Sequence, residues 1–163
     1  MNKTLMISGF ISLIGVGFIP ENENEFCIPE EVEIVQVKIS DKEIQANRLI
    51  EALIQVESSG REDCVGDRHL IVPSIGVLQI RPIMVREVNR ILAILGDDKR
   101  YTNKDRYSRK KSIEMFIIWR DYHHKDDSDE VVSRNWNAGP KGYKKKKTLH
   151  YWKKVQKALK KIA

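Results

Sequence analysis

The sequence lacks several features by which common classes of protein are recognised. It has two cysteines and four histidines in 163 residues, and these show no spacing typical of a zinc site. It contains no glycine-rich loop of the kind that cradles phosphate groups, and no internal repeat. We therefore expect neither a metal ion nor another cofactor.

No apolar run is long enough to cross a membrane comfortably. The stretch from Leu5 to Ile19 carries no charge, but it is short and is soon followed by acidic residues. Lys3 precedes it, and Gly15 and Gly17 provide an imperfect cleavage context. This pattern predicts a signal peptide over residues 1–20 and export to the periplasm or the medium, with an uncleaved membrane anchor as the alternative.

The sequence does not determine whether its two cysteines, Cys27 and Cys64, form a disulfide. In an oxidising compartment they can pair and so join the N-terminal segment to the loop after the first helix. Two free thiols are the alternative, because the sequence does not supply the geometry that a disulfide needs.

Acidic residues are absent from Ala138 to the C-terminus, where ten lysines stand instead. The net charge of the chain is +6, although residues 21–40 begin with an acidic stretch. That segment continues with β-branched residues. A basic end of this kind favours anionic polymers as partners, including the polymers of a bacterial wall. The alternative is a solvated face that promotes solubility.

The remaining chain has the composition of one soluble, mainly helical domain, with 41% hydrophobic and 32% charged residues. We expect this domain over residues 41–163, after an extended lead-in at 21–40. Apolar periodicity and end signals predict helices at 41–58 and 82–95, from Ser108, from Asp127 to about Asn137, and from Thr148. Residues 61–75 lack helical periodicity, which predicts a small β-hairpin or an irregular insertion.

Glu57 is out of place on the first predicted helix. Its spacing puts it on the apolar face formed by Leu49, Leu53 and Ile54. A carboxylate there is costly, and desolvation would raise its pKa and make it a proton donor near neutral pH. The alternative is an ordinary glutamate that reaches water at the end of the helix.

Short motifs around Glu57 occur in a familiar order. They are Glu57-Ser58, Gly76-Val77-Leu78-Gln79, Asn135-Trp136-Asn137-Ala138-Gly139-Pro140, and a closing helix from Thr148 to Val155 that contains Tyr151. Together they resemble the lysozyme-like superfamily, and most closely the SLT-type lytic transglycosylases. The resemblance implies a lysozyme-like domain and covers about residues 47–155.

The resemblance also implies an activity and a role for several residues. Glu57 would be the catalytic acid/base that cleaves peptidoglycan between N-acetylmuramic acid and N-acetylglucosamine, leaving an anhydro end. Ser58 would bind the reacting sugar, Gln79 would hold substrate or water, and Asn137 would orient the substrate. Tyr151 would point its hydroxyl towards Glu57 or the sugar. Alternatively, Gln79 and Asn137 only satisfy backbone groups in turns.

Two departures from the family pattern leave alternatives open. Trp136 replaces the family's tyrosine, and its ring can stack on a sugar or pack in the core. Asp67, or Asp63, could be a second carboxylate, since retaining glycosidases hold two carboxyl groups about 5 Å apart. Asp67 then indicates a hydrolytic muramidase, although an aspartate after Gly66 is also a good turn residue.

Two non-enzymatic readings remain beside the enzyme. One is a wall-binding module that holds glycan strands without cutting them, and the other is a nucleic-acid binder that uses the lysine-rich end. The predicted export and the absence of a nucleic-acid-binding motif argue against nucleic acid. We expect a monomer whose partner is the glycan strand of peptidoglycan.

Overall fold

The computed structural model describes residues 41–162. The predicted signal peptide (1–20), the lead-in (21–40) and Cys27, with its pairing to Cys64, lie outside the described residues. The elements in chain order are helix α1 (Asp41–Glu57), strands β1 (Val65–Gly66) and β2 (Ser74–Ile75), helix α2 (Pro82–Ile94), the 3-10 helix η1 (Asn103–Tyr107), helices α3 (Arg109–His123) and α4 (Asp129–Ala138), the 3-10 helices η2 (Gly142–Lys144) and η3 (Lys146–Thr148), and helix α5 (Leu149–Ile162).

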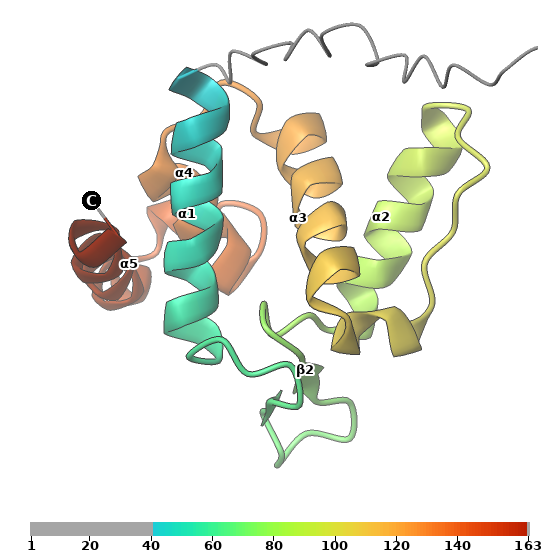
Figure 1. Cartoon of the computed structure of the whole chain (residues 1–163), viewed down its shortest axis with the longest axis horizontal. Helices are drawn as coiled ribbons and strands as arrows, with labels where there is room; N and C mark the ends of the chain where they lie inside the picture. The colour runs from blue at the N-terminus through green and yellow to red at the C-terminus, as the bar shows by residue number, and fades with distance from the viewer. Residues whose placement is uncertain (1–40, 163) are drawn as a thin grey trace, which may run out of the picture. The chain divides into compact units, whose positions relative to one another are not determined.

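The helices pack in pairs around one core. Helix α1 lies against α5, α2 lies against α3, and α4 also contacts α5 (Figure 1). An ion pair between Glu51 of α1 and Arg109 at the start of α3, with a nitrogen–oxygen distance of 2.6 Å, connects the α1–α5 pair to the α2–α3 pair. Leu53, Leu78 and Phe116 are fully buried and come from α1, the turn after β2 and α3, so one apolar core joins these parts of the fold.

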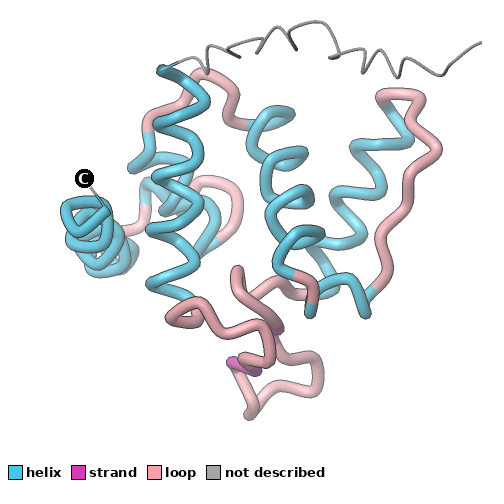
Figure 2. The backbone as a smooth tube through the Cα atoms, viewed as in Figure 1, coloured by secondary structure: helices cyan, strands magenta, loops and turns pink. Residues whose placement is uncertain are grey.

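A two-stranded antiparallel hairpin follows α1, with Val65 opposite Ile75 and Gly66 opposite Ser74 (Figure 2). Ile75 also forms a bridge with Ile80, so the chain turns back on itself before α2. The prediction of a mainly helical fold with a small hairpin after the first helix is confirmed.

Most helix ends follow the signals in the sequence. Helix α1 ends where Ser59 and Gly60 take left-handed backbone angles (φ 56° and 83°), and Pro82 is the first residue of α2. The hydroxyl of Ser108 accepts a hydrogen bond from the Lys111 N–H, which caps α3 as expected.

The sequence places the cap of α4 at Asp127, which is one residue too early. Ser128 caps this helix instead, because its hydroxyl accepts a hydrogen bond from the Val131 N–H. The Asp127 carboxylate forms a different contact, because it lies 2.7 Å from the His124 ring nitrogen Nδ1.

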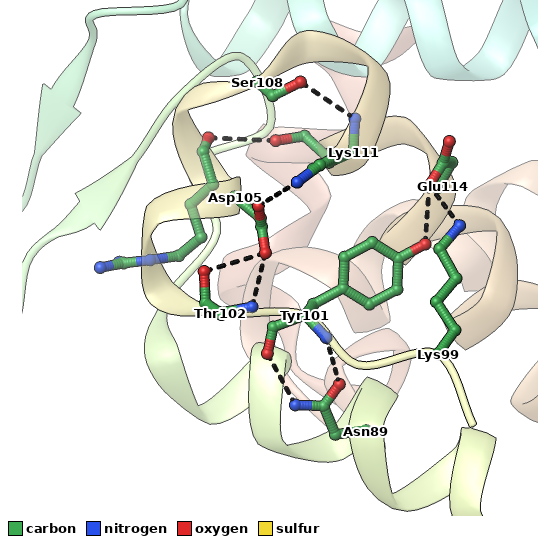
Figure 3. A network of polar contacts seen from close by, with 10 residues as sticks. Asn89, Lys99, Tyr101, Thr102, Asp105, Ser108, Lys111 and Glu114 are labelled. Atoms are coloured by element: carbon green, nitrogen blue, oxygen red, sulfur yellow. Dashed lines mark hydrogen bonds and ion pairs between the residues drawn. The ribbon is translucent and has the colours of Figure 1, made fainter. Parts of the chain in front are cut away.

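A polar network fixes the segment between α2 and α3 (Figure 3). The Asn89 side chain binds both the N–H and the C=O of Tyr101, each at 2.8 Å. The Tyr101 hydroxyl donates to Glu114 at 2.8 Å, and Glu114 also pairs with Lys99 at 2.7 Å. This segment is therefore held to both helices by side chains rather than by regular secondary structure.

Within residues 41–162, no helix is long and apolar enough to cross a membrane. The predicted signal peptide lies outside this range, and export stays a prediction.

Gly76 sits where the hairpin meets η1, and this contact generates a stability prediction. Its φ is +81°, and an added Cβ would collide with the backbone oxygen of Arg106. We expect Gly76→Ala to lower the free energy of unfolding by about 2–4 kcal/mol, from the left-handed backbone plus the collision. Chemical denaturation of both proteins measures this.

Gly96→Ala is the matched control, since Gly96 has a φ of +73° and open space around its Cβ position. It should lose only about 1 kcal/mol, the cost of the left-handed backbone alone. Equal losses in the two variants would show that the hairpin does not press against η1 at Gly76.

Candidate functional site

The candidate site is a hydrogen-bonded pair of side chains between the two helices that pack together. Glu57 is the last residue of α1 and is half-buried, and Tyr151 lies in the first turn of α5 and is buried. The Tyr151 hydroxyl donates a hydrogen bond of 2.7 Å to Oε1 of Glu57. The structure therefore agrees with the expected direction of the Tyr151 hydroxyl.

The surroundings of Glu57 favour its neutral form. Burial raises the pKa of its carboxyl group to about 7, and the negative charge of Asp67 raises it as well. The Tyr151 hydrogen bond and the positive charge of Lys154 act in the opposite direction and are outweighed. Burial and the neighbouring Glu57 also raise the pKa of the Tyr151 phenol, which keeps this group protonated as a donor.

This geometry determines what the pair can do chemically. Near neutral pH, a substantial fraction of Glu57 is a carboxylic acid, which can donate a hydrogen bond or a proton. Tyr151 occupies Oε1 as a donor. The acidic proton therefore belongs on Oε2, the oxygen that the phenol leaves free.

Ser58 anchors the end of α1 to the turn that follows β2. Its side chain is buried, and its hydroxyl lies 3.2 Å from the carbonyl oxygen of Ile54 and 2.9 Å from that of Val77. The hydroxyl oxygen of Ser58 also accepts a hydrogen bond from the Gly60 N–H. Ser58 thus positions the residue before it, and its predicted contact with a sugar stays a prediction.

Gln79 holds the base of the hairpin together. Its amide nitrogen donates to the carbonyl oxygens of Cys64 (3.1 Å) and Gly76 (2.8 Å), and its amide oxygen accepts from Ser74 (2.9 Å). Three partners satisfy most of the capacity of this amide. In the structure, Gln79 therefore satisfies polar groups of the hairpin and its turn. A role in binding substrate stays a prediction.

The residues at the end of α4 divide between core and surface. Trp136 packs edge-on against Phe116 and Trp119, with ring centroids 4.9 Å and 5.1 Å apart, so its ring belongs to the aromatic part of the core. Asn135 is buried, and its side chain accepts a hydrogen bond from the Tyr143 N–H. Asn137 is exposed and therefore accessible to a ligand.

Asp67 and Asp63 are both exposed in the segment after α1. Asp67 is close enough for its charge to act on Glu57. Its backbone is left-handed (φ 47°), and its carbonyl accepts a hydrogen bond from the Leu70 N–H, which is typical of a turn. Asp67 therefore combines a turn position with an electrostatic effect on the site.

A surface cavity lies away from the pair of Glu57 and Tyr151, between α1, α3, α4 and α5. It has a volume of about 680 Å³, and its lining includes Leu49, His124 and Trp152 but neither Glu57 nor Tyr151. Among the side chains that the structure describes, no group of three or more His, Cys, Asp and Glu is placed to hold a metal ion.

The sequence motifs do not assign a role to two residues, Lys154 and Asn135. Lys154 follows Tyr151 by three positions, a helical spacing that signals a shared face, and its charge reaches Glu57. Asn135 differs from the family pattern, and its buried role depends on the backbone of η2, which the sequence did not predict.

Comparison with known proteins yields one solved structure of similar fold. No protein-family model and no curated protein matches the chain. The match is to one chain of the crystal structure entitled "Aeromonas hydrophila PliI in complex with Meretrix lusoria lysozyme". The TM-score is 0.56 and the identity 21%, over 68% of this chain and 87% of that chain. At this identity the likeness concerns the fold alone.

This finding corrects the identification as an SLT-type lytic transglycosylase. The similar structure is a complex of PliI with a lysozyme, and no lytic transglycosylase or family model for one matches. The assigned activity, cleavage of peptidoglycan by a lyase or glycosidase, is corrected with it. It rested on short motifs, and the structure uses two of their polar residues, Ser58 and Gln79, in contacts with the backbone.

The raised pKa of Glu57 predicts how stability depends on pH. The folded protein binds this proton more tightly than the unfolded chain, whose carboxyl has the ordinary value of 4.5. The free energy of unfolding contributed by Glu57 therefore falls as the pH rises from about 4.5 through about 7. Replacing Glu57 by glutamine removes this loss, so the variant should exceed wild type at about pH 8 by up to about 3 kcal/mol.

Thermal and denaturant unfolding at about pH 4 and about pH 8 checks this, with Glu62→Gln as a control that removes a charge from an exposed site. If the stability of both variants depends on pH in the same way, the group that binds this proton in the folded protein is not Glu57.

The neighbours of Glu57 predict opposite shifts of its titration. Tyr151→Phe removes a hydrogen bond that favours the ionised form, so the pKa of Glu57 should rise. Asp67→Asn removes a negative charge that disfavours ionisation, so the pKa should fall. Carbon-13 NMR of the labelled Glu57 carboxyl measures both, and shifts of the same sign would contradict the arrangement.

Proposed function

We propose that residues 41–162 form a lysozyme-like domain whose Glu57 site binds a saccharide chain, the glycan strand of peptidoglycan. In this proposal the protonated Glu57 carboxyl donates a hydrogen bond from Oε2 to a sugar oxygen. Tyr151 orients the carboxyl, and the exposed Asn137 is a further proposed contact. The single observation that carries the proposal is the half-buried Glu57 acid held by a buried phenol at 2.7 Å.

The chemistry of the pair supports a neutral, polar ligand. A carboxylic acid with a pKa of about 7 can donate to ether and hydroxyl oxygens without placing a charge against them. A metal ion or a cationic ligand would instead require the ionised form, which burial disfavours here. Sugars carry many such oxygen acceptors along a chain.

The lysozyme-like fold is itself part of the proposal. It is supported by a likeness of fold to one chain of a crystal structure that contains both PliI and a lysozyme. Export, which would bring the domain to the bacterial wall, is proposed from the sequence of residues 1–20.

Calorimetric titration of the full chain with purified glycan strands tests the proposal. We expect binding at about pH 6 that weakens at least about tenfold at about pH 8.5, because the donor is lost when Glu57 ionises. Glu57→Gln keeps an N–H donor and should bind equally at both pH values. Glu62→Gln should retain the pH dependence of wild type.

Two outcomes would overturn this proposal. One is wild-type binding that does not change between the two pH values, or no binding at all. The other is the appearance of new chain ends in the glycan during incubation, which would show that the domain cuts the strand instead of only holding it.

Binding of a partner protein is a second candidate function, because the matched structure is itself a complex of two proteins. The exposed lysines of this chain would favour an acidic surface on such a partner. Co-elution of the full chain with a purified lysozyme on a sizing column tests this candidate, and separate elution would exclude a lysozyme as a stable partner.

A further inference from the structure

The lysines that follow Ala138 form a basic surface on the last part of the fold. All ten are exposed, and no acidic residue follows Ala138 in the sequence. Among the side chains that the structure describes, no ion pair joins any of these lysines to an acidic residue. Their charges therefore face solvent without carboxylates between them.

Helix α5 carries five of these lysines on one side. Lys153, Lys157 and Lys160 follow one another by four and three residues, so they form a stripe along the helix. Lys154 and Lys161 flank this stripe, and the five positions together cover about a third of the circumference of the helix. We call this set of five the lysine face.

The lysine face points away from the core. The opposite side of α5 is buried through Tyr151, Val155 and Ala158. Helix α5 packs on α1 and α4 through that side, and it lies at the edge of the fold in Figure 1. The lysine face is therefore the outer side of a helix whose inner side is already occupied.

The stability of the helix does not account for this arrangement. Like charges three or four residues apart repel each other, as Lys157 and its neighbours in the stripe do. Lys160 and Lys161 suit the negative end of the helix dipole, but the four lysines at 144–147 precede the positive end. Solvated surfaces usually intersperse charges of both signs. A face of one sign attracts polyanions instead.

We infer that the lysine face of α5 binds a flexible polymer with an anionic phosphodiester in each repeat, the chemistry of a polyol-phosphate wall polymer. One exposed ion pair contributes little, so binding requires several charges on the same chain. The face provides them at successive helix turns, over about 10 Å from Lys153 to Lys160. This surface is separate from Glu57, and the inference does not depend on the proposed function.

The kind of cation fits such a polymer. No arginine follows Ala138, so every cation of this surface is a lysine. Lysine ammonium groups are mobile point charges that suit phosphates at variable positions, whereas arginine suits fixed bidentate pairing. The surface is therefore suited to a repeating charge rather than to one fixed anion.

A flexible chain also fits the shape of the face better than a stiff or flat partner. The five lysines lie on a curved surface, so a flat membrane or a straight duplex reaches fewer of them at once. Duplex DNA stays straight over about 150 base pairs. A membrane lacks a further contact, because the apolar side of α5 is buried and is not free to insert into lipid.

Two triple variants of the full chain, each with three lysines replaced by glutamine, test the inference. The stripe variant combines Lys153→Gln, Lys157→Gln and Lys160→Gln. It keeps Lys154, whose charge acts on Glu57. The control variant replaces exposed lysines outside α5 that form no ion pair with a described side chain: Lys104, Lys110 and Lys125. Both variants lose three positive charges, so their net charges match.

The probe is end-labelled poly(glycerol phosphate), and fluorescence anisotropy measures its binding at several salt concentrations. At about 50 mM salt, we expect the stripe variant to bind about tenfold more weakly than wild type, and the control variant less than about twofold more weakly. The slope of log affinity against log salt should become shallower by about 2 in the stripe variant alone, since each phosphate contact of a single strand contributes about 0.7.

Duplex DNA and vesicles of anionic phospholipid, at equal phosphate concentration, check the choice of partner. We expect wild type to bind both more weakly than the polymer. Binding to either that is as tight or tighter would contradict the inference. Equal losses in the two triple variants, or no binding of wild type to the polymer, would contradict it as well.

Melting temperatures separate a binding role from a structural one. The stripe variant should be at least as stable as wild type, because it removes pairs of like charges. A lower melting temperature would show that these lysines support the fold instead. Binding of glycan strands plays no part in these measurements, so the inference and the proposed function can fail separately.

Discussion

The hydrogen bond from Tyr151 to Glu57 connects the two helices on which the site depends. It joins the last residue of α1 to the first turn of α5, the two helices that lie against each other in Figure 1. The buried phenol needs an acceptor, and the partly buried carboxyl group needs a donor. The packing of α1 on α5 supplies both partners, so the site is part of the core interface rather than an addition to it.

The hairpin provides the other support of Glu57. Ser58 ties the end of α1 to Val77, while Gln79 joins the two sides of the hairpin through Cys64 and Gly76. Arg106 then holds the outside of the turn through the carbonyl oxygens of Pro73 and Ile80. These polar side chains replace the long strands that the hairpin lacks, and they set the position of Asp67 relative to Glu57.

Local patterns predicted the helices and the anomaly of Glu57, because burial follows from spacing along one helix. The repeat of Leu49, Leu53 and Ile54 was sufficient for that. The sequence leaves open whether Gln79 binds substrate or satisfies backbone groups in a turn, because only the fold brings its partners Cys64 and Gly76 near. The contact of Ser58 with Val77 likewise depends on the fold, whereas the three-residue spacing of Lys154 from Tyr151 is already visible in the sequence. The family identification failed because short motifs in order do not establish ancestry, and it assigned roles to polar residues that bind backbone.

The account depends on Glu57 being protonated near neutral pH in the folded protein. Infrared difference spectra between wild type and Glu57→Gln test this directly, since a protonated carboxyl has its own C=O stretching band. At about pH 6, well above the ordinary pKa of a glutamate, the account predicts such a band in wild type that the variant lacks and that disappears by about pH 8.5. A wild-type spectrum that shows only ionised carboxylate at about pH 6 would contradict it.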